Sequence, residues 1–236
     1  VFEELFLFSL SISLARGALA QGSAPVLNGA NLDAFYQALP FAFLHMLFSG
    51  SQAINSAFMV IYFQARAQQG TDIGDAGIVL MIWGVAIFLC RPLVGRLYDR
   101  AGLVPAAAIC MSCSALYMVL LGLTPNAWVS YLGTLVFGGF GGCSASVLQA
   151  AAYAAAPLSK KGAANSTNLM GGDIGAAIGG VVCGWSVTAF VVPGQPALGY
   201  QISYVLCALP LAVAIVFCVA LRKSRLLRPA PVTDVS

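Results

Sequence analysis

The chain has 236 residues, of which 60% are hydrophobic and only 8% are Asp, Glu, Lys or Arg. Because a soluble domain carries about a quarter charged residues, this composition and a mean hydropathy of +0.89 exclude an ordinary soluble domain and indicate a protein embedded in a bilayer. The formal net charge of +3 does not indicate a nucleic-acid partner, because the basic residues lie where membrane topology requires them.

The first 37 residues stand apart from the rest of the chain. Residues 5–21 are apolar but short, and a polar stretch with Gly and Pro follows them. Three alternatives are open: the end of a further span, an interfacial helix, or a signal-type sequence that ends at residues 18–20. Glu3 and Glu4 occupy the place of the basic residues of a signal peptide, which favours a truncated span.

Six apolar stretches, each close to or above the roughly 20 residues of a membrane span, predict helices over 40–64, 76–94, 103–123, 127–156, 167–191 and 200–221. Turn formers near Pro125 and Pro193 divide two long uncharged stretches, so each of these predicts a helical hairpin. We therefore expect an all-α integral membrane protein, with a six-transmembrane-helix bundle over 38–228 and a tail over 229–236.

The loop charges predict the orientation, because Lys and Arg in short loops stay in the cytoplasm. If the 40–64 helix starts at the cytoplasmic face, nine basic residues lie on that side and only Arg66 lies on the other. The nine are Arg91, Arg96, Arg100, Lys160, Lys161, Arg222, Lys223, Arg225 and Arg228. We expect a multi-pass protein of the inner (plasma) membrane with a cytoplasmic C-terminus.

All seven cysteines fall inside predicted spans. Cys110 and Cys113 have the spacing of a redox or metal motif, but no His or acid lies beside them in the sequence. We interpret the cysteines as packing residues, and we expect no disulfide, metal or cofactor.

One charged segment separates the second and third predicted helices: Gly95-Arg96-Leu97-Tyr98-Asp99-Arg100-Ala101-Gly102. We expect a tight turn that the two glycines permit. Asp99 would then lie at the membrane surface, where a carboxylate can accept hydrogen bonds from the N-terminus of a neighbouring helix. The alternative is an ordinary cytoplasmic loop whose arginines only set the topology.

This octapeptide resembles the G-x-L-a-D-r-x-G signature of the major facilitator superfamily (MFS), and the chain is similar to that family over about 38–228. The basic residues that often follow the signature are replaced by Leu103, Val104 and Pro105. The resemblance implies one half of an MFS fold. It also implies a gating motif, made of Gly95, Arg96, Asp99, Arg100 and Gly102.

Further features resemble the C-terminal half of drug and sugar efflux members. The fourth helix has no arginine, the fifth has no Gly-Pro motif, and residues 163–167 are similar to the segment that those members place before the fifth helix. The resemblance implies that residues 1–37 hold a remnant of helix six and an interdomain loop. It also implies that the partner is either a missing N-terminal half or a second copy.

Polar residues recur along two of the spans and are candidates for substrate contacts, since polar groups are costly in hydrocarbon. The resemblance implies that the first and fourth helices line the central cavity. The substrate-binding candidates are Gln52, Asn55, Gln149 and Tyr153. The alternative for each is a hydrogen bond between helices.

Two titratable residues inside the spans remain to be assigned. Asp173 either pairs with Arg91 or Arg96 in a cytoplasmic gate, which we favour, or carries protons. His45 either couples transport to protons, since histidine is the side chain suited to proton uptake near neutral pH, or is a hydrogen-bonded packing residue.

Glycines spaced four residues apart, such as Gly171, Gly175 and Gly179, predict close helix packing. A chain with one His, one acid well inside a span and no metal-ligand pair gives little support to an enzyme. By resemblance we expect a secondary transporter, or half of one, that exports a small organic solute against protons by alternating access. The alternative is a non-transporting or truncated membrane protein that acts as an assembly partner.

Overall fold

The computed structural model describes residues 29–124, 126–156 and 160–221. Within these ranges six helices are long and apolar enough to cross a membrane, which confirms the predicted all-α bundle. The first three spans are α2 (Gly29–Gln68), α3 (Ala76–Ala101) and α4 (Leu103–Leu123). The fourth joins α5 (Ala127–Gly133), η1 (Thr134–Gly138), α6 (Gly139–Gly142) and α7 (Ser144–Ala155). The last two are α8 (Lys161–Ala189) and the pair α9 (Leu198–Leu206) and α10 (Ala208–Leu221).

The first helix is longer than the sequence predicted. α2 begins at Gly29, whereas the predicted span begins at residue 40. The predictions for residues 1–28 and for the tail over 229–236 concern residues outside the described ranges.

The connection between α3 and α4 differs from the predicted turn. α3 starts at the N-cap Asp75, whose carboxylate accepts a hydrogen bond from the Ile78 amide at 3.0 Å. It continues through the charged octapeptide to Ala101, and only Gly102 turns the chain, with φ at +85°. The Gly102 amide donates to the carbonyl of Tyr98 at 2.9 Å. Gly95 is therefore a helical residue, and the prediction that it forms the turn was wrong.

The fourth span is not one uniform α-helix. η1 is a π-helical segment, in which hydrogen bonds join residues five apart rather than four, and such segments often mark functional sites. The Trp83 indole of α3 donates to the carbonyl of Gly138 at 3.2 Å, where η1 ends. A second irregularity follows at Cys143, between α6 and α7.

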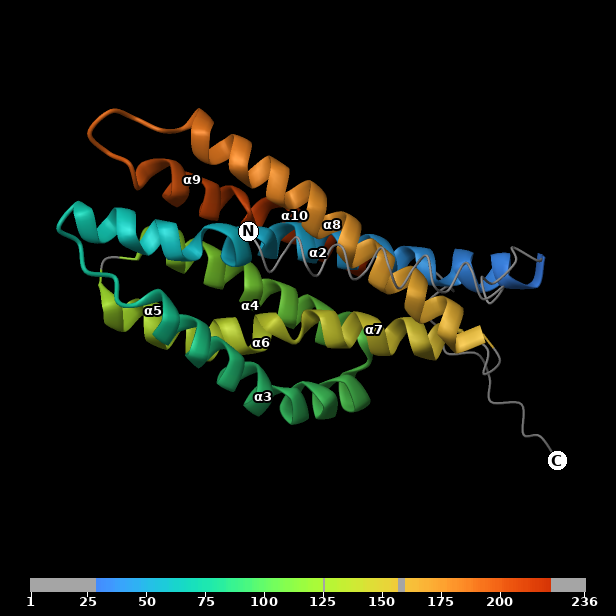
Figure 1. Cartoon of the computed structure of the whole chain (residues 1–236). Helices are drawn as coiled ribbons and strands as arrows, with labels where there is room; N and C mark the ends of the chain where they lie inside the picture. Colours follow the sequence, from blue (N-terminus) through green and yellow to red (C-terminus); the bar gives the residue numbers. More distant parts are fainter. Residues whose placement is uncertain (1–28, 125, 157–159, 222–236) are drawn as a thin grey trace, which may run out of the picture.

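The most extensive helix pair is α2 with α8, which cross along one side of the bundle in Figure 1. Gly171, Gly175 and Gly179 of α8 face the backbone of α2 so closely that a methyl group at any of them would meet a carbonyl oxygen there. The glycine spacing therefore marks a helix seam, as predicted.

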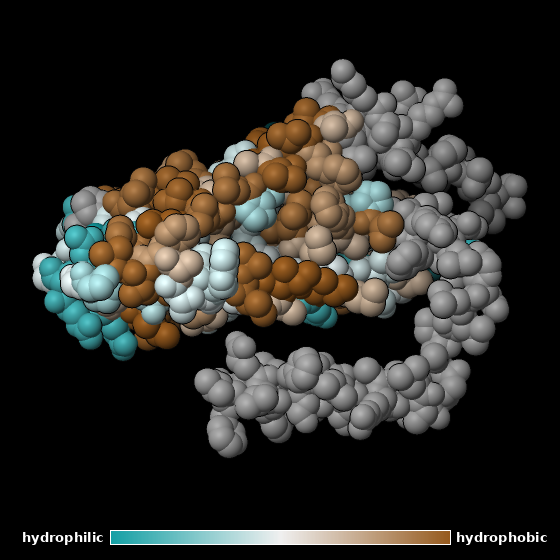
Figure 2. All heavy atoms as spheres, turned by 90° about the horizontal axis from the view of Figure 1, so that it is seen from above, coloured by the Kyte–Doolittle hydropathy of each residue, from teal (hydrophilic) through white to brown (hydrophobic). Residues whose placement is uncertain are grey.

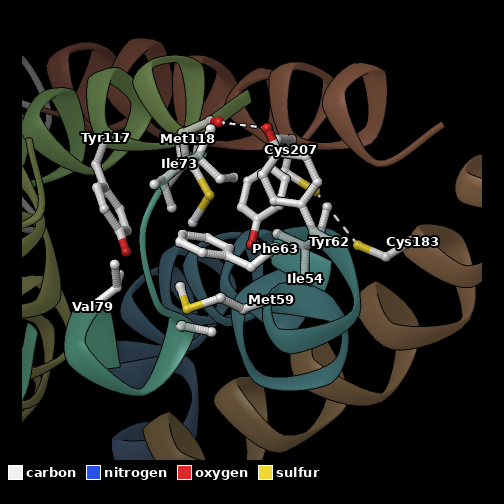
Figure 3. Close-up of a cluster of buried hydrophobic side chains, with 14 of the residues drawn as sticks. Ile54, Met59, Tyr62, Phe63, Ile73, Val79, Tyr117, Met118, Cys183 and Cys207 are labelled. Carbon is white, nitrogen blue, oxygen red and sulfur yellow. Dashed lines mark hydrogen bonds between the residues drawn. The ribbon is translucent and has the colours of Figure 1, made fainter. Parts of the chain in front are cut away.

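Buried side chains form two main clusters, one toward each end of the bundle. The cluster in Figure 3 includes Tyr62, Tyr117 and Tyr204, and the Tyr62 hydroxyl donates to the carbonyl of Leu121 at 2.9 Å. Figure 2 shows a largely hydrophobic surface along the bundle and hydrophilic residues at one end. Phe88 of α3 is 74% exposed, as expected for a side chain that faces lipid.

Candidate functional site

The charged octapeptide lies at the end of α3, on the surface of the bundle. Arg96, Asp99 and Arg100 are all exposed. Figure 1 shows the end of α3 and the start of α8 toward the same end of the bundle, so the basic residues of these two segments share that end. This shared end agrees with the clustering of Lys and Arg on one side of the membrane, from which the orientation was predicted.

A groove of about 390 Å³ lies beside the octapeptide. Its α3 wall includes Arg91, Gly95 and Asp99, and its other wall comes from Cys143 and α7, with Ser146 among the lining residues. A methyl group at Gly95 would meet no atom within 4 Å, so the groove is open at this glycine. The groove thus holds a cation, an anion and a hydroxyl group in a space that another chain segment or a small polar group can enter.

Gln52 and Asn55 join α2 to α4. Gln52 Nε2 donates to the Ser114 hydroxyl at 2.7 Å, and Asn55 Nδ2 donates to Gln52 Oε1 at 2.7 Å. Asn55 is only 5% exposed, and its Oδ1 has no hydrogen-bond partner. Gln52 is half-buried and remains accessible. The arrangement makes Asn55 a residue that orients Gln52 rather than a contact at an open surface.

Gln149 and Tyr153 lie on α7, toward the opposite end of the fourth span from η1. Gln149 Nε2 donates to Asn165 Oδ1 of α8 at 2.9 Å, and Gln149 is half-buried. Tyr153 is 37% exposed. These two side chains are therefore within reach of a ligand on that side of α7.

The two polar groups lie at different depths. Asn165 precedes Asn168 by about one turn, and the Asn168 carbonyl contacts His45 Nδ1 at 3.0 Å. Gln52 is seven residues further along α2 than His45, which is about 10 Å at 1.5 Å per residue. The structure therefore does not bring Gln52 and Gln149 into one compact site. They form two separate polar sites at different depths in the bundle.

His45 is buried in the seam between α2 and α8. Its ring lies over Gly172, where a methyl group would come within 2.9 Å of Cε1. The side-chain N and O atoms of Asn168 are buried beside this contact without a hydrogen-bond partner. Asp173 follows Gly172 directly, and its side chain is exposed.

Asp173 and its expected partners Arg91 and Arg96 lie on helices with different main neighbours. α8 packs on α2, α7 and α9, whereas α3 packs mainly on η1, α6 and α4, and Figure 1 shows α3 and α8 on opposite sides of the bundle. The predicted pairing assumes that two helices that reach the same membrane surface are also neighbours, and it stays a prediction.

Three residues of these networks were not predicted from the sequence: Ser114, Asn165 and Asn168. Asn165 and Asn168 are three residues apart in a span, which is the same signal that singled out the stripe on the first helix. Ser114 is a lone serine in an apolar helix, and the sequence gives no signal for its role.

No group of three or more His, Cys, Asp and Glu side chains that could hold a metal ion occurs in the searched part of the chain, which is its described residues. The arrangement is one of neutral hydrogen-bonding groups and two titratable groups in an apolar bundle. In a comparison with known families, the sequence model described as Major Facilitator Superfamily matches residues 41–234.

Proposed function

The chain belongs to the Major Facilitator Superfamily, and on this premise we propose that it exports a small organic solute in exchange for protons by alternating access. Membership makes it a multi-pass membrane protein of a family of secondary transporters of small solutes. The efflux direction and the proton coupling rest on the resemblance to drug and sugar efflux members and on the chemistry described above.

The observation that carries the proposal is the set of accessible neutral polar groups on the first and fourth spans. Gln52, Gln149 and Tyr153 each combine a hydrogen-bonding group with partial or full exposure. Such groups in an otherwise apolar bundle fit a solute that is held by a few hydrogen bonds and apolar contacts. A solute would meet Gln149 and Tyr153 near one end and Gln52 near the middle.

Proton coupling is assigned to Asp173 and His45. Since α8 and α3 pack mainly on different helices, we take forward the alternative that Asp173 is a proton carrier. Asp173 follows Gly172, against which the His45 ring packs, so both titratable groups lie at one level of the α2–α8 seam. A movement of α8 against α2 would alter the surroundings of both Asp173 and His45. Such a link between helix movement and titratable groups is what proton coupling requires.

The cytoplasmic gate is assigned to Arg96, Asp99 and Arg100. Asp99 lines the groove between α3 and α7, so a segment that enters the groove in one state and leaves it in the other would make and break contacts with the carboxylate. Its partner would come from a second six-helix bundle, either in the same polypeptide or in a second copy. We further propose that this end of the bundle is cytoplasmic, in the inner membrane.

The test is a transport screen in proteoliposomes, with and without an imposed pH gradient, using a panel of sugars and lipophilic dyes. We expect uptake of one class into vesicles that depends on the gradient, and we expect Asp173→Asn to abolish the gradient dependence. Asp72→Asn is the matched control, because Asp72 is an exposed acid of the α2–α3 loop. Gradient-independent transport would refute the coupling, and a lack of any transport would favour the assembly-partner alternative.

A further inference from the structure

Two thiols meet across the interface between α8 and the sixth span. The Sγ atoms of Cys183 and Cys207 are 3.4 Å apart, and Figure 3 shows the two side chains pointing toward one another. Cys183 belongs to α8, and Cys207 lies at the junction of α9 and α10. Both thiols are free in the structure.

A second contact holds the same interface about one turn away. The hydroxyl groups of Ser186 and Ser203 lie 2.7 Å apart, and Ser203 also donates to the carbonyl of Gly199 at 2.7 Å. This contact fixes α8 against α9 and keeps the two thiols opposite each other. A disulfide has an S–S length of about 2.05 Å, so the sulfur atoms must approach by little more than 1 Å. Cys207 can supply this movement because the helix is interrupted there.

The two thiols are buried, with Cys183 2% and Cys207 8% exposed, beside a groove on the side of the bundle. Cys183 and Cys207 line a groove of about 450 Å³, whose wall also includes apolar residues such as Val182 and Leu206. Trp185, which also lines the groove, is 71% exposed. Because this surface lies within membrane spans, the molecules that enter the groove are those that dissolve in the hydrocarbon, and charged water-soluble reagents are excluded.

We propose that Cys183 and Cys207 form a redox-active thiol pair that a membrane-soluble two-electron oxidant of the quinone class converts into a disulfide. Two S–H bonds break and one S–S bond forms. The two electrons and two protons pass to the quinone, which becomes a hydroquinone, so no net charge is left in the apolar groove. The product is a covalent link between α8 and the sixth span.

The test uses the full chain in proteoliposomes, with a protease site inserted at Gly194 in the exposed loop between the two helices. After treatment with a short-chain ubiquinone and capping of free thiols with a maleimide, the loop is cleaved and the products are separated without reducing agent. We expect the two fragments to stay joined and to separate on addition of dithiothreitol. Peptide mass mapping of the chain without the insertion should show Cys183 and Cys207 in one linked peptide.

Three variants make the result specific. Cys183→Ser and Cys207→Ser should each lose the cross-link, whereas Cys110→Ser, which changes a buried thiol in α4, should keep it. Fragments that separate after quinone treatment, or a cross-link that survives Cys207→Ser, would overturn the proposal. Cross-linking by diamide with the quinone inert would also overturn it, because the oxidant class would then be wrong.

Discussion

The seam between α2 and α8 offers a sharp test of the packing, because the same substitution can be made at two positions of one helix. Gly175 faces the α2 backbone, and a methyl group there would collide with the carbonyl oxygen of Met46 and lie 2.7 Å from its Cα. Gly180, five residues further along α8, has no atom within 4 Å of the same position. The predicted change is Gly175→Ala, with Gly180→Ala as its control.

The magnitude follows from the contact distances. Ordinary contact begins at 3.4 Å, so α2 and α8 must separate locally by at least about 0.7 Å, the shortfall at Met46 Cα, and by more at the closer carbonyl oxygen. Overpacking of this kind costs about 1–3 kcal/mol. At about 2–4 °C per kcal/mol for a chain of this length, Gly175→Ala should lower the melting temperature by about 2–12 °C. Gly180→Ala should leave it unchanged or raise it slightly, because Ala favours a helix over Gly by about 1 kcal/mol.

The assay is thermal unfolding of the purified protein in a mild detergent, followed by tryptophan fluorescence. Size-exclusion chromatography of both variants before heating shows that each starts from a folded, monodisperse state. Equal melting temperatures for Gly175→Ala and Gly180→Ala would refute the close α2–α8 contact. A larger loss for Gly180→Ala would show that α8 presents a different face to α2.

Three further outcomes are expected. Asp99→Asn should reduce transport by about tenfold to hundredfold, since a charge-assisted hydrogen bond contributes about 1.5–3 kcal/mol to one state. Expression and membrane insertion should stay normal, and unchanged transport would remove Asp99 from the gate. Gln149→Ala should raise KM for the transported solute by about threefold to tenfold, the equivalent of one lost hydrogen bond, and an unchanged KM would confine Gln149 to its contact with Asn165. Tyr62→Phe should destabilise the protein by about 1 kcal/mol through loss of the hydrogen bond to the Leu121 carbonyl, whereas Tyr153→Phe, at an exposed position, should not.

Much of the fold could be predicted because the bilayer restricts it. Uninterrupted apolar stretches of about 20 residues fix the number of spans, and all six occur near their predicted places. The ends were less predictable, since charge does not stop a helix. α3 passes through Arg96, Asp99 and Arg100 and ends only at Gly102, where the positive φ suits glycine.

The polar contacts could be predicted only in part. Hydrogen-bonding groups inside spans were recognised as significant, but their partners depend on how each helix is rotated about its axis. Gln52 contacts Ser114 because of that rotation, and the helices of Asp173 and Arg91 have different main neighbours because the order of helices around the bundle is not the order along the chain. A single sequence contains no direct signal for either property.

The π-helical segment at Thr134–Gly138 has a consequence for the fourth span as a whole. Its hydrogen bonds join residues five apart instead of four, so the segment is equivalent to one extra residue inserted into an α-helix. In an α-helix each residue adds about 100° of rotation, so absorbing that extra residue into α-helical geometry would turn α7, with Gln149 and Tyr153, about the helix axis relative to α5. The indole N–H of Trp83 donates a hydrogen bond to the Gly138 carbonyl at the end of this segment. A single hydrogen bond from α3 therefore helps to set the rotation of α7, and with it the direction in which the polar face of the fourth span points.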